Sequence, residues 1–419
     1  MNDFNYIDQE LWCEQIPVRD IAEKVGTPLY LYSHQTLKNH FHVFDQAFAG
    51  VPHIICFAAK SNSNIAILRI FVAEGGGVDI VSGGELYRAM QAGVDPRKVV
   101  YSGVGKRLDE IEYAVNADIL MFNVESFQEL AEINACAQRL KQRAGIALRV
   151  NPDVDPQTHP YISTGLKENK FGVNIEKSIE AYREARKMPW LDIKGVSCHI
   201  GSQVTKVSPF VDALNRLKKL VRLLREEGID IRYVDLGGGL GITYNEEQPP
   251  HPQDYAKAII AAAKDMDCTF IFEPGRVIVG NAGILVTKVL YTKTNEGKNF
   301  VIVDAGMNDL LRPSLYNSYH QILPVMKRGR KMVQADIVGP ICESGDYLAK
   351  ERNIPEFERG ELMAVMSAGA YGFTMSSNYN SRPRVAEVLV KGGRSYVIRR
   401  RERYADIVRG EKIPKFLTT

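Results

Sequence analysis

The sequence predicts an eight-stranded α/β barrel followed by an all-β domain. Apolar runs of strand length alternate with amphipathic runs of helix length over about 250 residues, which makes eight strand–helix units. After about residue 280 the long helices stop, and short strand-like runs follow one another. The count and size of the first region are those of a (β/α)₈ barrel, and the change of pattern indicates a second domain.

The chain of 419 residues is long enough for two domains. We expect the barrel to span residues 27–280 and a β-sandwich or β-barrel domain to span residues 281–419. Residues 1–26 have a mixed pattern. Because no barrel strand needs them, we expect them to pack with the β domain. A doubly wound open sheet is the competing architecture for the first domain, although it normally carries fewer repeats.

The expected elements follow in order along the chain. Residues 28–32 have the pattern of a strand, with Ser33 as the N-cap of a helix. The eight barrel strands are expected at 53–59, 77–81, 98–102, 119–123, 145–150, 193–199, 232–236 and 269–273. The helices are expected at 65–74, 83–92, 107–117, 126–141, 176–187, 208–227 and 252–264. In the second domain, strands are expected at 284–290, 300–303, 331–338, 361–366, 385–390 and 395–398.

The composition is that of a soluble globular protein, with 45% hydrophobic and 25% charged residues. The formal net charge of +3 gives no argument for a nucleic acid or an anionic membrane as a partner. No apolar stretch reaches the roughly 18 residues that a membrane span needs, and no export signal is visible. The six cysteines are scattered without a CxxC pair, so we expect reduced thiols, a cytoplasmic location and no metal site.

Functional side chains of such a barrel lie at the carboxyl ends of its strands. Polar or glycine residues follow nearly every predicted strand at that end, although turn chemistry alone would place some of them there. They are Lys60, Asp79 with Ser82, Ser102, Asn123, Asn151, His199 with Ser202, 237–239 and 273–276.

Lys60 directly follows the first predicted barrel strand, in the stretch FAAKSNSN at 57–64. A lysine at a strand end usually extends to water. In a partly dry pocket its amine is nucleophilic enough to form a Schiff base with a carbonyl compound. The position alone favours the solvated lysine, and the rest of the chain decides between the two.

The glycine run 237–239 follows the seventh strand, and Gly275 and Arg276 follow the eighth. Successive glycines let backbone N–H groups approach a phosphate, and the loops after strands seven and eight are the usual phosphate site of these barrels. A tight turn is the alternative for the glycine run. Arg276 adds a cation that suits either a phosphate or a carboxylate.

Glu273 ends an apolar strand, and a buried carboxylate needs a partner. With pyridoxal 5′-phosphate (PLP) as ligand, the partner would be the pyridine nitrogen, and the protonated ring accepts the electron pair left at a substrate carbon. A structural salt bridge, for instance with Arg276, is the alternative. His199 either stacks on such a ring or is a structural histidine with one hydrogen bond.

Two stretches of the β domain are too polar for plain strands. Arg312 and Tyr316 are four residues apart, so they either clamp a carboxylate or belong to an ordinary surface turn. Residues 342–344 present a thiol, a carboxylate and a hydroxyl in succession. A thiol can return a proton to a carbanion and a carboxylate can pair with an ammonium group, whereas a solvated loop is the alternative.

Together these motifs resemble the diaminopimelate decarboxylases, a family of the alanine racemase-like (fold type III) PLP-dependent enzymes. The resemblance covers nearly the whole chain and is specific through the combination of motifs. Ser61, Ser63 and Val385 depart from the usual family pattern without touching a chemical role. The matching stretches are FAAKSNSN (57–64), DIVSGGEL (79–86), NPDVDPQTHPYISTGLKENKFG (151–172), SCHIGSQ (197–203), DLGGGLG (235–241), EPGR (273–276), LLRPSLY (310–316), GPICESGD (339–346) and AYGFTMSSNYNSRPRVAE (370–387).

The resemblance implies a role for each candidate residue. Lys60 would hold PLP as a Schiff base, and Cys342 or the freed Lys60 would return a proton to the α-carbon. The residues around the cofactor would be Lys60, His199, Ser202, Gly238, Gly239, Glu273, Gly275, Arg276 and Tyr371. The residues that bind the substrate would be Arg276, Arg312, Tyr316, Glu343, Ser344 and Tyr371.

The resemblance further implies decarboxylation of meso-2,6-diaminopimelate to L-lysine and CO₂, the last step of lysine biosynthesis. The loop with Cys342 would enter the other subunit's site, so a homodimer with shared active sites is expected. Three alternatives remain: an ornithine- or arginine-type decarboxylase, a PLP-carrying protein without activity, and a racemase. Arg312, Tyr316 and Glu343 argue against the first, because a substrate without a distal carboxylate would leave the arginine unpaired. Lys60 and Cys342 argue against the second, and Glu273 against the third.

Overall fold

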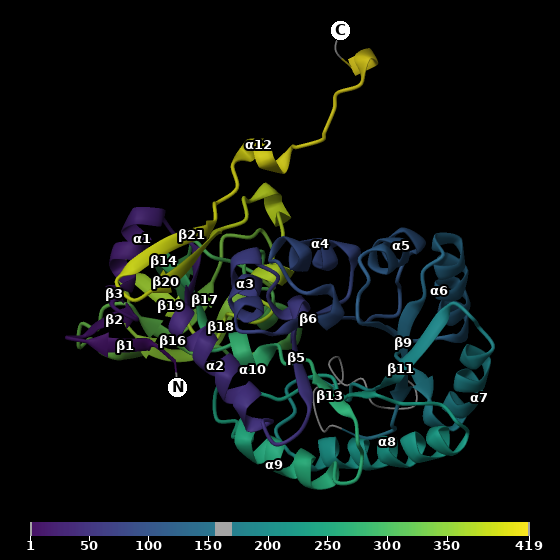
Figure 1. The fold of residues 1–419 in the computed structure, drawn as a ribbon. Coiled ribbons are helices and arrows are strands. Elements are labelled where there is room, and N and C mark those ends of the chain that lie inside the picture. Colours follow the sequence, from purple (N-terminus) through teal and green to yellow (C-terminus); the bar gives the residue numbers. More distant parts are fainter. Residues whose placement is uncertain (1, 156–169, 418–419) are drawn as a thin grey trace. The chain divides into compact units, whose positions relative to one another are not determined.

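The computed structural model describes residues 2–155 and 170–417. The chain divides into two compact units, shown in Figure 1 with colours that follow the sequence. Leu37–Gly280 forms one unit. Met1–Thr36 together with Asn281–Thr419 forms the other, so this second unit is built from both ends of the chain.

In the described part of Leu37–Gly280, eight parallel strands close into a barrel (Figure 1). Each strand pairs with the next along the chain, and β13 pairs with β5 to complete the ring. A short strand, β10 (Val173–Asn174), pairs with β9. The barrel strands are β5 (His53–Ala58), β6 (Gly77–Ile80), β7 (Val99–Tyr101), β8 (Met121–Val124), β9 (Ala144–Asn151), β11 (Leu191–Ser197), β12 (Tyr233–Asp235) and β13 (Thr269–Phe272).

Helices connect the barrel strands and lie around them (Figure 1). Several begin at a side chain that accepts the N–H of a residue in the first turn: Asn64 caps α3, Ser82 caps α4 and Ser126 caps α6. The helices are α2 (His34–Ala47), α3 (Ile65–Ala73), α4 (Gly83–Gln91), α5 (Leu108–Asn116), α6 (Phe127–Leu140), α7 (Ile175–Arg186), α8 (Ser208–Glu226), α9 (Pro252–Ala262) and α10 (Arg276–Val279).

The unit made from the two chain ends is mainly β-structure. Its larger sheet has the strand order β18-β17-β15-β14-β4-β20-β21, and β19 pairs with both β14 and β16. A separate antiparallel sheet has the order β1-β2-β3. The elements are β1 (Phe4–Ile7), β2 (Glu10–Cys13), β3 (Ile16–Pro17), α1 (Val18–Val25), β4 (Leu29–Ser33), β14 (Gly283–Asn295), β15 (Lys298–Val303), α11 (Arg312–Tyr316), β16 (Ile322–Pro324), β17 (Met332–Val338), β18 (Tyr347–Pro355), β19 (Leu362–Val365), β20 (Ala386–Lys391), β21 (Arg394–Arg399) and α12 (Tyr404–Ile407).

Strand β4 belongs to the β unit, whereas the sequence placed residues 28–32 in the barrel domain. It pairs antiparallel with β14 and parallel with β20. Leu29 and Leu31 share one hydrophobic core with Leu11 from the N-terminal hairpin and Ile284 from β14. All five residues of β4 are buried, and such an apolar strand carries no sign in its own sequence of which sheet it joins.

The fold class predicted from the sequence is confirmed. The pairing of β13 with β5 closes the sheet, which excludes the doubly wound alternative. Each expected barrel strand agrees with the structure to within two residues at either end. In the β unit, the pattern did not predict β1–β3, β16 or β18, which are short or carry several exposed charged residues. Across residues 2–155 and 170–417, no helix has the length and apolar composition to cross a bilayer.

Candidate active site

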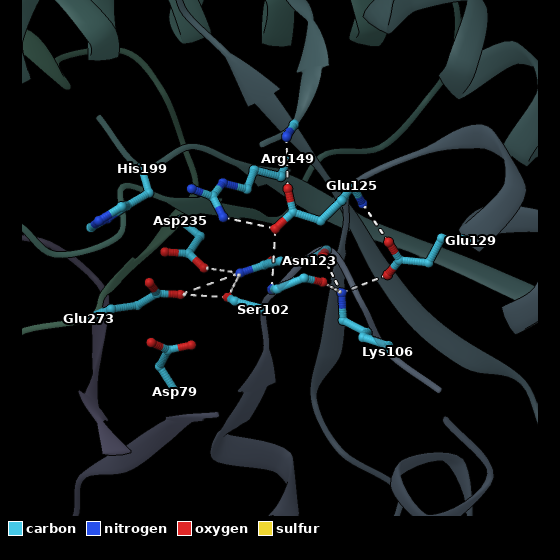
Figure 2. A network of polar contacts seen from close by, with 12 residues as sticks. Asp79, Ser102, Lys106, Asn123, Glu125, Glu129, Arg149, His199, Asp235 and Glu273 are labelled. Carbon is cyan, nitrogen blue, oxygen red and sulfur yellow. Dashed lines mark hydrogen bonds and ion pairs between the residues drawn. The ribbon is translucent and has the colours of Figure 1, made fainter. Parts of the chain in front are cut away.

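The carboxyl ends of the barrel strands bring buried polar side chains together (Figure 2). Asp79 lies on β6, Asn123 on β8 and Asp235 on β12, while Glu273 directly follows β13. All four are buried. Parallel strands of a barrel end at the same rim, which is why residues nearly 200 positions apart in the chain meet here.

Lys60 lies in a short 3₁₀ turn, Ala59–Ser61, that follows β5. Its Nζ is 2.7 Å from Oδ2 of Asp79. The aspartate side chain is fully buried and the lysine side chain is 31% exposed. The other oxygen of Asp79, Oδ1, is buried and has no hydrogen-bond partner among the described residues. The amine of Lys60 is therefore paired with a buried carboxylate at the rim of the barrel, where the side chain is only partly exposed. It does not simply extend into water.

Asn123, on β8, contacts both acidic side chains at the ends of β12 and β13, two strands that pair with each other (Figure 2). Its Nδ2 lies 2.8 Å from Oδ2 of Asp235 and 3.3 Å from Oε1 of Glu273. The same nitrogen lies 3.1 Å from Oγ of Ser102, which is in turn 3.5 Å from Oε1 of Glu273. One amide thus holds two buried carboxyl groups close together.

The electrostatics of this cluster favour a cationic ligand. Burial raises the pKa of Asp235 to about 6. Burial also raises the pKa of Glu273 well above its ordinary value, and the negative charges of Asp235 and Asp79 raise it further. A positively charged ring next to Glu273 would relieve that repulsion and favour the ionised carboxylate.

His199 follows β11 at the same rim, and a glycine turn holds its ring. Its Nδ1 accepts a hydrogen bond of 3.2 Å from the N–H of Gly238. Burial, and then the positive charges of Lys60 and Arg149, hold the pKa of His199 well below its ordinary value. The imidazole is therefore neutral, as its acceptor role requires, and it is positioned by the glycine run.

The glycine run is shaped by close backbone approaches. A Cβ on Gly238 would collide with the carbonyl oxygen of Glu273, and one on Gly239 would collide with that of Gly201. Gly239 has a φ of +116°, which disfavours other residues. The tight packing allows β12 and β13 to end side by side, and it places Gly238 against the backbone of Glu273 and Pro274.

Arg276 is the first residue of α10. Its Nη1 lies 2.6 Å from the hydroxyl of Tyr244, and its Nη2 lies 2.9 Å from Oγ of Ser202. The guanidinium therefore makes these contacts where the sequence had left open an ion pair with Glu273. Together, the guanidinium, the serine hydroxyl and the glycine backbone make a site whose donors suit an anion.

The residues at the barrel rim fit PLP. The buried carboxylates around Glu273 suit a protonated pyridine ring, and the glycine run with Ser202 and Arg276 suits a phosphate. Lys60 supplies an amine for an aldehyde. The three features match the three functional groups of one cofactor, which a plain structural ion-pair network would not require.

The remaining candidate residues lie in the β unit. Arg312 and Tyr316 are on α11, with the guanidinium carbon 5.9 Å from the centre of the tyrosine ring. Arg312 is buried and lies 3.3 Å from Oγ of Ser318 and 3.4 Å from Nε2 of His320, so it is not in an ordinary surface turn.

The second group in the β unit is more exposed. Cys342, Glu343 and Ser344 are exposed in the loop between β17 and β18, and Cys342 is the exposed thiol among six free cysteines. Tyr371 has a φ of +55°, a strained conformation for a tyrosine that is common at functional sites.

Sequence reasoning missed several residues of the rim. Asp79 and Asn123 were noted as strand-end residues, but nothing in the sequence showed that they contact Lys60 and Glu273. Asp235 stood inside the glycine motif without a role of its own. Tyr244 gave no signal, because it lies in a loop 32 positions before Arg276 and reaches it only through the fold.

A further group of charged side chains lies on one side of the acidic cluster, beyond Asn123 (Figure 2). Glu125 accepts from Nη1 of Arg149 at 2.8 Å and from the N–H of Gly172 at 2.7 Å. Lys106 and Glu129 form a buried ion pair of 2.6 Å next to it. This group fixes the ends of the loops that carry the inner residues.

Comparison with known proteins agrees with this site. The model of the family "pyridoxal-dependent decarboxylase, pyridoxal binding domain" matches residues 34–280. The chain is 51% identical to a diaminopimelate decarboxylase of Vibrio cholerae, covering 97% of this chain and 98% of that protein. It is 53% identical to one of Haemophilus influenzae, covering 96% and 97%. A crystal structure of diaminopimelate decarboxylase from Helicobacter pylori, complexed with L-lysine, matches with a TM-score of 0.90 at 44% identity, covering 93% of this chain and 98% of that chain. The chain therefore belongs to the diaminopimelate decarboxylase family of pyridoxal-dependent decarboxylases.

Proposed function

We propose that this enzyme converts meso-2,6-diaminopimelate to L-lysine and CO₂ with PLP as its cofactor. The observation that carries the proposal is the pairing of Lys60 with buried Asp79 at the same rim as Glu273 and the glycine cradle. The relatives with about half of their residues identical over nearly the full length support the choice of substrate.

Different barrel residues would bind different functional groups of PLP. Lys60 would supply the amine that holds the aldehyde group, Glu273 would accept a hydrogen bond from the protonated pyridine nitrogen, and His199 would contact the ring. When bound, PLP supplies an electron sink that accepts the electron pair released as CO₂ leaves. The phosphate is bound by Ser202, Gly238, Gly239, Gly275 and Arg276.

Glu273 must be ionised for this role, although burial raises its pKa in the free protein. A ring N–H placed at the carboxylate replaces the proton that the Asp235–Glu273 pair would otherwise retain. Cofactor binding should therefore release a proton near Glu273 at neutral pH, and Asn123 keeps Oε1 of Glu273 in place during that change.

The substrate residues come mainly from the β unit. Arg276, Arg312 and Tyr316 bind the distal carboxylate, since guanidinium groups bind carboxylates by two parallel hydrogen bonds. The distal amino group is read by Glu343 and Ser344. Tyr371 contacts the cofactor and the substrate.

Protonation of the α-carbon completes the reaction, with Cys342 or Lys60 as donor. Cys342 enters the other subunit's site in this proposal, so the working form is a homodimer with shared active sites. A cytoplasmic location is part of the same proposal and rests on the six free cysteines.

A substrate panel tests the proposal. PLP-saturated enzyme is incubated with meso-diaminopimelate, L-lysine, L-ornithine or L-arginine, and CO₂ and the amine product are measured. We expect CO₂ and L-lysine from meso-diaminopimelate, at a rate at least about 100-fold above that with the other three, because each lacks the distal carboxylate. Comparable rates with lysine or ornithine would overturn the assignment of substrate.

A further inference from the structure

Asp346 joins two loops of the β unit through its carboxylate. Oδ1 accepts a hydrogen bond of 2.6 Å from the N–H of Met307, and Oδ2 accepts one of 2.6 Å from the N–H of Ile341. Asp346 is 4% exposed. Each oxygen therefore holds one loop: residues 304–311, which lead into α11, or residues 339–346.

Two glycines leave room for this carboxylate. A Cβ on Gly339 would lie 2.5 Å from Oδ2 of Asp346, and one on Gly306 would lie 3.0 Å from Oδ1. One glycine belongs to each loop. The loops thus approach the carboxylate closely from both sides, and the contact is specific to a short acidic side chain.

Further contacts hold the same loop. Oγ of Ser314, on α11, donates to the carbonyl oxygen of Gly345 at 2.6 Å. The N–H of Cys342 donates to Oδ1 of Asn380 at 2.8 Å. The side chains of residues 342–344 are themselves exposed, so the position of their loop depends on these anchors.

We propose that Asp346 is a positioning residue that fixes the loop of Cys342, Glu343 and Ser344 relative to the segment that presents Arg312. The inference rests on the proposed function, because that function gives both segments their roles. A carboxylate that bonds two backbone N–H groups cannot be replaced by an amide. In Asp346→Asn one acceptor oxygen becomes an NH₂ donor, which faces a second donor and loses that bond.

The test combines hydrogen exchange with kinetics on the full-length, PLP-saturated enzyme. In Asp346→Asn, amide exchange in segments 304–311 and 339–346 should be faster by at least about tenfold, while exchange across β5 and β6 stays unchanged. The kcat/KM for meso-diaminopimelate should fall by about tenfold or more, and bound PLP, read from its absorbance, should stay at the wild-type level.

Asp336→Asn is the matched control. Asp336 is also buried in the β unit and accepts the N–H of Glu351 with Oδ1 at 2.7 Å, but its other oxygen pairs with the half-exposed Lys298. An amide at position 336 keeps the backbone hydrogen bond. We expect this variant to leave kcat/KM and exchange in the two loops within about twofold of wild type.

The outcomes separate the inference from the proposed function. Unchanged exchange in both loops of Asp346→Asn would overturn the positioning role, even with reduced activity. If that variant does not fold, exchange is measured on wild type, and unprotected N–H groups at Met307 and Ile341, the two donors to Asp346, would overturn the inference. Faster exchange in a protein whose wild type releases no CO₂ would sink the proposed function and leave the loop contact standing.

Discussion

Asn123 shows how a single residue can define an acidic cluster. Its amide nitrogen lies between Asp235 and Glu273 and holds the two buried carboxyl groups close together. Burial raises the pKa of both acids, most strongly that of Glu273, and leaves the cluster suited to a cation, while the hydrogen bond from Asn123 by itself lowers the pKa of Asp235. The chemistry of the site therefore depends on residues behind those that touch the cofactor.

Asp235→Asn should change how the cofactor-free protein responds to pH. The pKa of Asp235 is about 6 in the folded chain and about 4 when unfolded. Through this group the folded state binds more protons than the unfolded state between about pH 4 and 6, so the contribution of Asp235 to stability falls as pH rises through that window. Without this carboxyl, Tm at pH 6 relative to Tm at pH 4 should be higher than in wild type.

Thermal unfolding of cofactor-free protein in steps from pH 4 to 7 measures this effect. Asp230→Asn is the control, since the side chain of Asp230 is 79% exposed. The same change in Tm from pH 4 to pH 6 in Asp235→Asn as in wild type would show that Asp235 does not titrate in this window.

Arg312→Lys should weaken substrate binding more than cofactor binding. Lysine keeps the positive charge but loses the planar fork that binds a carboxylate with two hydrogen bonds. We expect KM for meso-diaminopimelate to rise about tenfold or more, with bound PLP unchanged. Steady-state kinetics and PLP absorbance measure the two effects, and a parallel loss of both would indicate a folding defect.

At the scale of elements, the site depends on how β12 and β13 end. The two strands pair in register from Tyr233 with Thr269, and the glycine run after β12 then packs on the backbone after β13. The strand ends could be predicted because a polar residue follows an apolar run at each of them. The contacts between loops could not be predicted from the sequence, because contacts such as that of Tyr244 with Arg276 arise only once the barrel is closed.

Gly238→Ala should weaken PLP binding, because the added Cβ would collide with the carbonyl oxygen of Glu273. The glycine run 237–239 and Glu273 would both shift. We therefore expect Kd for PLP to rise by at least about tenfold and Tm to fall. Gly84→Ala is the control. A Cβ there meets its nearest neighbour atom, Oγ of Ser82, at 3.7 Å, and alanine suits a helix. Equal PLP affinity in the two variants, measured by fluorescence titration, would contradict the account.

At the scale of the whole molecule, the β unit is assembled from both ends of the chain. β4 lies between β14 and β20, so residues 29–33 are central to a sheet whose other strands begin after residue 280. The alternation of strands and helices predicted the barrel to within two residues at its strands. It placed residues 28–32 in the barrel domain, whereas β4 belongs to the β unit, because a fully buried strand looks alike in either unit.

Leu31→Ala tests how far β4 holds the β unit together. Leu31 is fully buried in the core that the N-terminal hairpin shares with β14, so the truncation should destabilise the protein by about 2–5 kcal/mol. Ile413→Ala, at a 73% exposed position, should change stability by less than about 0.5 kcal/mol. Denaturant unfolding measures both, and similar values for the two would mean that β4 contributes little.

The amine of Lys60 is the proposed point of attachment of PLP, and every other proposed role at the barrel rim follows from it. Reduction of the PLP-saturated enzyme with borohydride, followed by peptide mapping by mass spectrometry, locates that attachment. A phosphopyridoxyl group on Lys60, absent from wild-type protein prepared without PLP, is the predicted result. A label on another lysine, or an active PLP enzyme without label at Lys60, would contradict it.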